Sequence, residues 1–342
     1  MESNQIDPSK IMQIGMGFWA SKTLLTAVNM KLFTLLGDTE LSGETIKNKL
    51  NLHDRSLYDF LDTLVSLGFL KRTGLKETSM YSNAPDTNLF LDKNKQQYIG
   101  GILEMANNRI YSFWNDLETG LKTGLPQNET KDNGTPVFEA IYADPKKLHE
   151  FIYAMAGVQM GGFIVFAKTF DFANYTSLCD IGGSGGHLSA QVALHNEHIH
   201  CTSFDLPPVS PVASEVIQSF GLSNRVSIVS GDFFEDDFPK ADIITMGNIL
   251  HDWGLEDKKM LMRKAFNALP NGGKFVVIEN IIDNDRRENS FGLLMSLNML
   301  IETENGYDFS KADFDELAYE IGFSRTESMP LAGPTSALIG IK

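Results

Sequence analysis

Cysteine is scarce in this chain, which contains only Cys179 and Cys201 among its 342 residues. Both lie in apolar runs that are typical of strands, so we expect two buried free thiols. A disulfide scaffold is not expected.

Basic side chains are in deficit as well. The chain has 29 Lys and Arg against 44 Asp and Glu, a formal net charge of −15. A surface of this sign repels phosphate backbones and anionic lipids, so we expect neither nucleic acid nor a membrane among the partners. For most of these charges, solubility is the simplest explanation.

Long apolar runs are also missing. Residues 1–10 show no apolar core of a secretion signal, and no stretch approaches the ~20 apolar residues of a membrane span. We therefore expect a cytoplasmic protein. Apolar residues nevertheless make up 42% of the chain, and a chain of this length usually forms more than one core, which favours two domains.

The first hundred residues are predicted to be mainly helical. Residues 11–36 are mostly apolar, and Ser42 and Asp54 are suited to cap the next two helices. The second of these helices carries an apolar stripe at helical spacing, and Gly68 ends it. The stripe consists of Leu57, Phe60, Leu61, Leu64 and Val65. With strand-like segments at residues 69–72 and 81–83, the pattern is that of a winged helix.

A winged helix suggests a DNA-binding regulator, the alternative function that is not enzymatic. The helix that would read DNA contains Asp54, Asp59 and Asp62 against Arg55 alone. Because DNA-reading helices need Arg or Lys, a packing or dimerisation module is favoured. Further helices are expected over residues 98–120 and 137–170, with a loop at 124–134 between them.

From residue 177 strands and helices alternate. Such alternation predicts an α/β fold with a doubly wound, mostly parallel sheet, closed by a final strand pair. The seven strands are expected at residues 177–181, 199–204, 226–229, 241–246, 274–279, 323–329 and 336–341, with intervening helices at 188–194, 212–220 and 258–269.

A glycine-rich turn, residues 180–187 (Asp-Ile-Gly-Gly-Ser-Gly-Gly-His), links the first of these strands to a helix. Glycines there let backbone approach a ligand, and the helix N-terminus favours an anionic group. The dinucleotide pattern G-x-G-x-x-G does not fit, and the phosphate-binding loop lacks its lysine. A ligand with a carboxylate, a ribose and an adenine but no phosphate fits better, which indicates S-adenosylmethionine.

Acidic residues end the next two strands. Asp205 is placed to accept both ribose hydroxyls, while Asp232 is placed to accept the adenine amino group and Phe233 to pack on its ring. Each acid alone is more often a helix cap or turn residue. Three consecutive strands that end in glycine or acid at one sheet edge favour a ligand site.

These motifs, together with Leu250-His251-Asp252-Trp253, resemble the small-molecule O-methyltransferases that act on caffeate, acetylserotonin, and bacterial polyketides and phenazines. The resemblance covers nearly the whole chain. It implies a winged-helix dimerisation domain at 1–105, a helical linker at 106–170 that contributes to the acceptor pocket, and an S-adenosylmethionine-binding domain at 171–342. A homodimer and a small-molecule acceptor follow from it.

The resemblance also implies roles for single residues. Gly182, Asp205, Asp232 and Phe233 match cofactor contacts, and the remaining candidates in these motifs are Asp180, Gly183, Leu206 and Asn248. His251 matches the catalytic base and Glu279 the acid that orients it. Asp308 stands where plant members have a second orienting Glu, and Gly247 stands where they have a Lys, so one cofactor contact is expected to be absent.

The chemistry fits these residues. Methyl transfer to a hydroxyl requires an aligned acceptor and a base that takes its proton, and His251 supported by Glu279 suits that task. A thioether acceptor needs no base, and S- or N-methylation on the same scaffold stays open, as does an acidic carbon.

Two other site types fit the sequence less well. A metal held by His251, Asp252 and Glu279 is disfavoured, because zinc prefers more His or Cys and magnesium prefers oxygen. A hydrolase elbow G-x-S-x-G matches around Ser184, but no histidine follows the acids in the order that such enzymes need. For five apolar side chains, lining of the acceptor pocket and plain core packing are equally good interpretations. They are Phe151, Met155, Met160, Phe163 and Met246. The acids Glu302 and Glu304, near the end of the chain, are expected to face either a polar acceptor or solvent.

Overall fold

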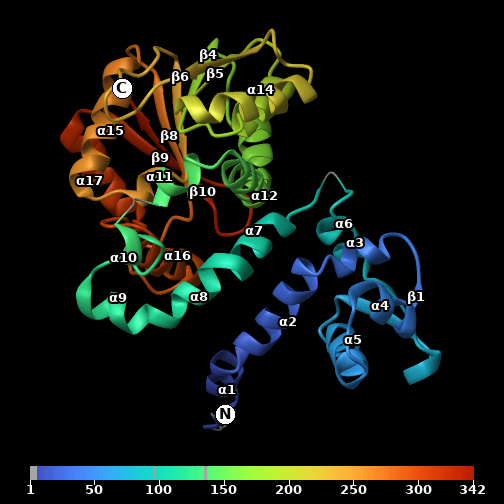
Figure 1. Cartoon of the computed structure of the whole chain (residues 1–342). Helices are drawn as coiled ribbons and strands as arrows, with labels where there is room; N and C mark the ends of the chain where they lie inside the picture. Colours follow the sequence, from blue (N-terminus) through green and yellow to red (C-terminus); the bar gives the residue numbers. More distant parts are fainter. Residues whose placement is uncertain (1–5, 96, 135–136) are drawn as a thin grey trace, which may run out of the picture. The chain divides into compact units, whose positions relative to one another are not determined.

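The computed structural model describes residues 6–95, 97–134 and 137–342, so the first five residues of the N-terminal segment 1–10 lie outside the described residues. The chain divides into two compact units, Met1–Ser112 and Phe113–Lys342. Each unit is described separately below (Figure 1).

The N-terminal unit combines helices with a small antiparallel sheet of order β1-β3-β2. Its strands are β1 (Leu41–Ser42), β2 (Leu70–Thr73) and β3 (Met80–Asn83). Its helices are α1 (Ser9–Gly15), α2 (Gly17–Asn29), α3 (Leu32–Leu36), α4 (Gly43–Leu50), α5 (Leu57–Ser66), α6 (Pro85–Leu91) and α7 (Gly100–Met105), followed by a π-helical turn at Ala106–Ile110. The predicted helix–hairpin arrangement is present, and its core contains Leu57, Leu61 and Leu64 of the apolar stripe.

The two predicted helix caps had different outcomes. Ser42 does cap α4, because its side chain accepts the Thr45 N–H. The prediction for Asp54 is wrong. Asp54 lies inside a short 3-10 turn that His53 caps, and its carboxylate pairs with Lys47 instead.

The second unit begins with short helices: α8 (Tyr111–Phe113), which crosses the division between the units, α9 (Leu117–Thr123), α10 (Thr130–Asn133) and α11 (Val137–Tyr142). The 25-residue helix α12 (Pro145–Thr169) follows. The helix expected over 137–170 is therefore two helices. Asp144 caps α12, and Pro145 at its first position cannot continue the preceding helix.

Helix α12 corrects another expectation. By length and composition it is apolar enough to cross a membrane, so the prediction that no stretch approaches a span is wrong. In the structure its residues Phe163, Phe166 and Ala167 are buried in a core with the sheet, which explains the apolar composition by packing.

The described part of this unit contains a seven-stranded sheet of order β6-β5-β4-β7-β8-β10-β9. Its strands are β4 (Ser177–Ile181), β5 (His200–Asp205), β6 (Val226–Ser230), β7 (Ile243–Gly247), β8 (Lys274–Glu279), β9 (Arg325–Pro330) and β10 (Ser336–Ile341). The first five are parallel, and β10 pairs antiparallel with both β8 and β9. The doubly wound, mostly parallel sheet predicted from the alternation is confirmed.

Two cores lie on the two faces of this sheet. One includes residues of α12 and α13 (His187–His195) and of α14 (Ser210–Ser219), and the other includes residues of α15 (Leu255–Ala268) and α17 (Lys311–Ile321). Helices α16 (Ser290–Glu302) and α17 were not anticipated. The strand order reverses between β4 and β7, and ligands of such sheets bind outside the carboxyl ends of the strands at that point.

Candidate active site

The glycine turn after β4 is held against the end of β5. The N–H groups of Gly182 and Gly183 both donate to the carbonyl of Phe204, at 2.9 and 3.2 Å. Gly182 has a φ of +68°, and a Cβ there would come within 2.4 Å of Ile249. A Cβ on Gly183 would come equally close to the Ser203 hydroxyl. The turn therefore requires glycine at both positions, and its backbone lies at the sheet edge.

Asp205 ends β5 and turns toward this turn. One carboxylate oxygen accepts the Ser184 N–H at 2.8 Å and the other accepts the Leu206 N–H at 2.7 Å. Because each oxygen has a further lone pair, the carboxylate keeps acceptor capacity for two adjacent hydroxyls. Burial raises its pKa to about 6, against these two hydrogen bonds. Leu206 contributes its backbone to the arrangement.

Asp180, at the other side of the turn, is more deeply buried. Its Oδ1 accepts the Thr245 hydroxyl of β7 at 2.7 Å, and burial raises the pKa of Asp180 to about 7. The carboxylate therefore supports the turn from within the sheet. Asp180 lies next to Gly183. A Cβ added to Gly183 would be 3.2 Å from the second carboxylate oxygen of Asp180.

The remaining expected cofactor residues surround the same edge. The Oδ1 of Asp232 accepts the Phe234 N–H at 2.8 Å, which organises the turn after β6. Phe233 lies 3.9 Å from the position of a Gly182 Cβ, and its ring meets Trp253 edge-on at 5.9 Å. Asn248, with a φ of +52°, follows β7 and donates its backbone N–H to Ile278. All the predicted cofactor candidates thus belong to the carboxyl ends of β4 to β7.

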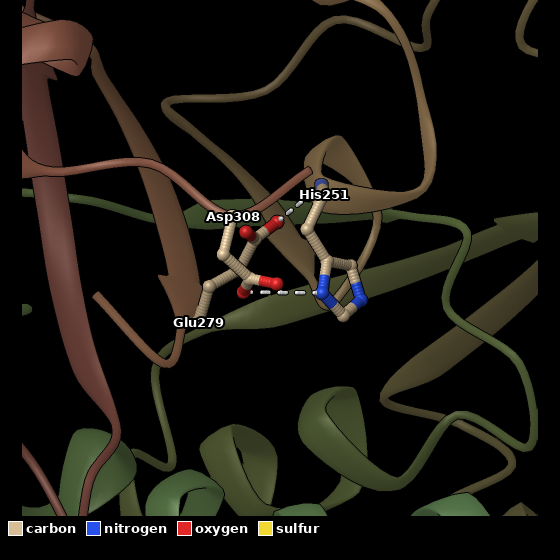
Figure 2. Close-up of side chains that lie close together, drawn as sticks. All are labelled: His251, Glu279 and Asp308. Carbon is tan, nitrogen blue, oxygen red and sulfur yellow. Dashed lines mark hydrogen bonds and ion pairs between the residues drawn. The ribbon is translucent and has the colours of Figure 1, made fainter. Parts of the chain in front are cut away.

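A second group of side chains converges next to this edge, where β7 and β8 end. It consists of His251, Glu279 and Asp308, all buried (Figure 2). His251 comes from the short helix Leu250–Asp252 after β7, Glu279 is the last residue of β8, and Asp308 lies in the loop after α16. Glu279 and Asp308 follow His251 by 28 and 57 positions, so the three side chains meet only in the folded chain.

The geometry differs from the simplest expectation. The imidazole Nδ1 lies 3.3 Å from Asp308 Oδ1, close enough for an ion pair but not aligned as a hydrogen bond. Glu279 Oε1 instead accepts the backbone N–H of His251 at 3.3 Å (Figure 2). In the structure the shorter Asp308, rather than Glu279, is the closer partner of the ring. The Nε2 atom lies 3.6 Å from Asp252 Oδ1.

The electrostatics of the cluster follow from burial beside several acids. Burial by itself would lower the pKa of His251, but Asp252, Asp308 and Glu279 outweigh it and raise that pKa to about 10. Burial raises the pKa of Glu279 to about 7 and that of Asp252 to about 6. The edge is thus acidic, and an added positive charge there would stabilise its carboxylates.

Sequence reasoning missed one buried member of this neighbourhood, Lys258 of α15, which is only 1% exposed. A signal was present. Lys258 precedes Leu261, Met262 and Ala265 at helical spacings, and these residues form the buried face of α15. The stripe therefore places a lysine on the face that packs against the sheet.

The alternative site types can be compared with the geometry. One potential ligand atom from each of His251, Glu279 and Asp308 lies within 4.8 Å of the others. One oxygen of Glu279 accepts the backbone N–H of His251, while its other oxygen is buried and has no hydrogen-bond partner among the described residues. For a hydrolase, Ser184 has the strained φ of +50°, but among the described residues its hydroxyl makes no hydrogen bond to a histidine.

The side chains that were expected near the acceptor differ in how deeply they are buried. Phe163 and Met246 are buried in the two separate cores on opposite faces of the sheet, so they are core residues. Met155 and Met160 on α12 are half-buried. Glu302 is buried, whereas Glu304 is exposed to solvent.

The fold and the edge define a class I methyltransferase with a helical N-terminal domain. Comparison with known proteins agrees. Residues 114–324 match the family model of the O-methyltransferase domain, and residues 12–93 match that of the O-methyltransferase dimerisation domain. The chain belongs to this family of S-adenosylmethionine-dependent O-methyltransferases.

Particular relatives extend over most of the chain. It is 34% identical to the 8-O-methyl transferase of tetracenomycin polyketide synthesis from Streptomyces glaucescens, over 98% of this chain and 97% of that protein. It is 32% identical to an N,N-dimethyltransferase of Streptomyces rimosus, over 80% and 78% of the two chains. Human N-acetylserotonin methyltransferase, solved in complex with SAM, superposes with a TM-score of 0.91 at 25% identity, over 100% of this chain and 99% of that one.

The residues present fit S-adenosylmethionine. The ligand has a ribose that Asp205 would hold and an adenine that would lie beside Phe233. Its net charge is positive, because its sulfonium and ammonium groups outnumber its one carboxylate. The buried acids of the edge, with their raised pKa values, are stabilised by such a charge. The enzyme uses S-adenosylmethionine to methylate a small organic acceptor.

Proposed function

We propose that this enzyme methylates a phenolic or enolic hydroxyl of a small molecule, with His251 as the general base. The observation that carries the proposal is the buried His251 beside Asp308 at 3.3 Å, next to the cofactor edge. Bound S-adenosylmethionine supplies the methyl group on an electrophilic sulfonium carbon. What remains for the protein is to align the hydroxyl and remove its proton.

Asp308 and Glu279 have complementary positions in this proposal. Asp308 faces Nδ1, so a proton on that atom leaves Nε2 as the basic nitrogen of the neutral ring. Glu279 holds the backbone at His251 and adds negative charge that stabilises the imidazolium formed by proton transfer. Two acids thus orient and stabilise one base.

The protonation state of His251 makes the expected rate depend on pH. Asp252, Asp308 and Glu279 raise the pKa of His251 against the effect of its burial, which favours the protonated ring when no ligand is bound. A base must be neutral, so its active fraction is lost as the pH falls below that pKa. A positive charge bound at the same edge would lower the pKa of His251 toward neutrality.

The acceptor class is also a proposal. Relatives named for 8-O-methylation of a polyketide and for acetylserotonin support a hydroxyl on an aromatic ring, whereas the N,N-dimethyltransferase relative keeps an amine as the second candidate. A screen of phenols, amines and thioethers with isotopically labelled cofactor decides between them. Labelling of amines alone contradicts the proposal of a hydroxyl acceptor.

The direct test is His251→Ala. We expect turnover to fall by about 10²–10⁴ because the base is lost, while the affinity for S-adenosylhomocysteine stays near that of the wild type. The loss should shrink as the pH approaches the pKa of the acceptor, where the anion forms without a base. Turnover is measured from pH 6 to 10 by chromatography of the labelled product.

His200→Ala serves as the control, since His200 is exposed at the opposite, amino end of β5. A His251→Ala variant that keeps a near-wild-type, pH-independent rate would contradict the base, as expected for a thioether acceptor that loses no proton. The same result in Glu279→Gln would show that its charge does not support an imidazolium.

A further inference from the structure

Lys258 has no part in the proposed proton transfer, yet it is buried beside the base. From α15 its Nζ donates to the Trp253 carbonyl at 2.5 Å and to the Tyr307 carbonyl at 3.1 Å. The first carbonyl lies two residues after His251, and the second belongs to the residue before Asp308. One ammonium group therefore joins the two chain segments that carry the base and its closest acid.

The two segments are also in close backbone contact. A Cβ on Gly306 would lie 2.6 Å from the His251 carbonyl oxygen and 2.7 Å from that of Asp252. Main chain thus packs on main chain here, which leaves no room for a side chain to adjust the separation. The relative position of His251 and Asp308 depends on what holds these segments together.

The loop is held at its other points as well. The Asp308 N–H donates to the Ser296 hydroxyl of α16 at 3.2 Å, and the Ile282 N–H donates to the Phe309 carbonyl at 3.1 Å. These bonds fix the loop to α16 and to the chain after β8. The side chain of Lys258 bonds this loop and the His251 segment at the same time.

The surroundings keep Lys258 in place. Its Nζ lies 3.4 Å from the centre of the Tyr307 ring, a cation–π distance. The acids that face it are Glu279 from β8, Asp308 from the loop, Asp252 beside the base and Asp257 on its own helix. Burial lowers the pKa of Lys258, whereas these four acids favour its charged form.

We propose that Lys258 is a positioning residue of the methyl transfer, which fixes Asp308 against His251 by bonding the carbonyls of Trp253 and Tyr307 together. This inference rests on the proposed function, because it acts through the His251–Asp308 pair. Loss of the ammonium releases the loop, so Asp308 no longer holds the imidazole in its orientation. The predicted cofactor residues at the carboxyl ends of β4 to β7 accept neither of these hydrogen bonds from Lys258.

The test compares Lys258→Met, Asp308→Asn and the double variant with the wild type. We expect Lys258→Met to lower kcat by about 10- to 100-fold, with the Kd of S-adenosylhomocysteine and the KM of the acceptor nearly unchanged. The double variant should be no slower than Asp308→Asn alone, since both changes disable one unit. Lys259→Met, a change to the neighbouring surface lysine paired with Glu320, should keep the wild-type rate.

Additive losses of kcat in the double variant would overturn the proposal, because a residue that merely stabilises the fold acts independently of Asp308. A wild-type kcat in Lys258→Met would also overturn it. Should Lys258→Met fail to fold, the same cycle is run with Lys258→Gln, which keeps an amide donor. If His251→Ala alone leaves the rate intact, the proposed function fails, whereas additivity with an essential His251 rejects only the role of Lys258.

Discussion

At the scale of single residues, the site shows acids with separate tasks. Asp205 has one backbone N–H on each oxygen and faces the cofactor edge, whereas Asp180 is bonded to Thr245 inside the sheet. Asp308 and Glu279 both contact His251, one at the ring and one at the backbone. The residue type was therefore informative about the chemistry, and the neighbours decide which task each acid has.

We expect Asp205→Asn to weaken the binding of S-adenosylhomocysteine by about 10- to 100-fold. The change removes the charge that accepts two hydroxyl hydrogen bonds, and such bonds to a charged group contribute about 1.5–3 kcal/mol. The affinity of the wild type should also fall as the pH drops below about 6, because the raised pKa lets Asp205 take up a proton there.

Isothermal titration calorimetry at pH 8 and pH 5.5 checks both expectations. Asp237→Asn, a change to an exposed acid that follows β6, is the control and should bind as the wild type does. Equal affinity of Asp205→Asn and the control would reject the assignment of Asp205 to the ribose.

At the scale of elements, the loop between α16 and α17 matters as much as the strands. It brings Asp308 to the base and lies directly against the backbone of residues 251–252. The close packing of this loop on residues 251–252 requires glycine at position 306. A Cβ on Gly306 would also lie 2.4 Å from the Thr303 hydroxyl. The glycine is needed here because of close approach to backbone, which cannot move aside as a flexible side chain can.

We expect Gly306→Ala to push this loop away from His251. Turnover should fall at least tenfold, and the free energy of unfolding should fall by about 1–3 kcal/mol, as for other overpacked sites. Affinity for S-adenosylhomocysteine should stay the same, because the glycine turn after β4 is not touched. Stopped assays of kcat and thermal melting measure these effects.

Gly162→Ala in α12 is the matched control. A Cβ there would meet Thr335 at 3.5 Å, an ordinary contact, so the change should keep kcat and the melting temperature. Unchanged turnover in Gly306→Ala would show that the loop has room to yield and that the position of Asp308 is less important than proposed.

At the scale of the whole molecule, the N-terminal unit leaves apolar side chains exposed. Those on α1 and α2 include Ile11, Met12, Ile14, Phe18 and Trp19, which are 51–74% exposed. Patches of this kind in a single chain mark an interface, and the matched dimerisation domain includes residues 12–93. We propose that the enzyme is a homodimer joined through this unit.

We expect light scattering at micromolar concentration to give twice the mass of the 38.0 kDa chain. Ile14→Asp combined with Trp19→Asp should shift the species toward monomer, since charges would replace apolar contacts. Leu194→Asp, at an exposed leucine of the other unit, is the control and should stay dimeric. A wild-type monomer at micromolar concentration would refute the homodimer.

Much of this protein follows from the sequence by itself. The period of the apolar residues placed the strands of the sheet, and β4, β8 and β10 have the predicted bounds. Local chemistry sufficed where a motif is contiguous, as in the glycine turn and the acid after β5. Local hydrogen bonding also explains why Ser42 capped its helix, while the same pattern failed for Asp54, whose carboxylate found Lys47 instead.

Only the tertiary structure decided which distant side chains meet. The loop that carries Asp308 has no periodic pattern, and α16 before it is apolar nearly all round. Neither pattern indicated that Asp308 would lie near Glu279 at the end of β8. Lys258 lay on a recognisable buried face, but its two carbonyl partners, Trp253 and Tyr307, are set by how α15 and the loop pack. Contacts between segments far apart in the chain depend on the packing of whole elements, which local spacing does not specify.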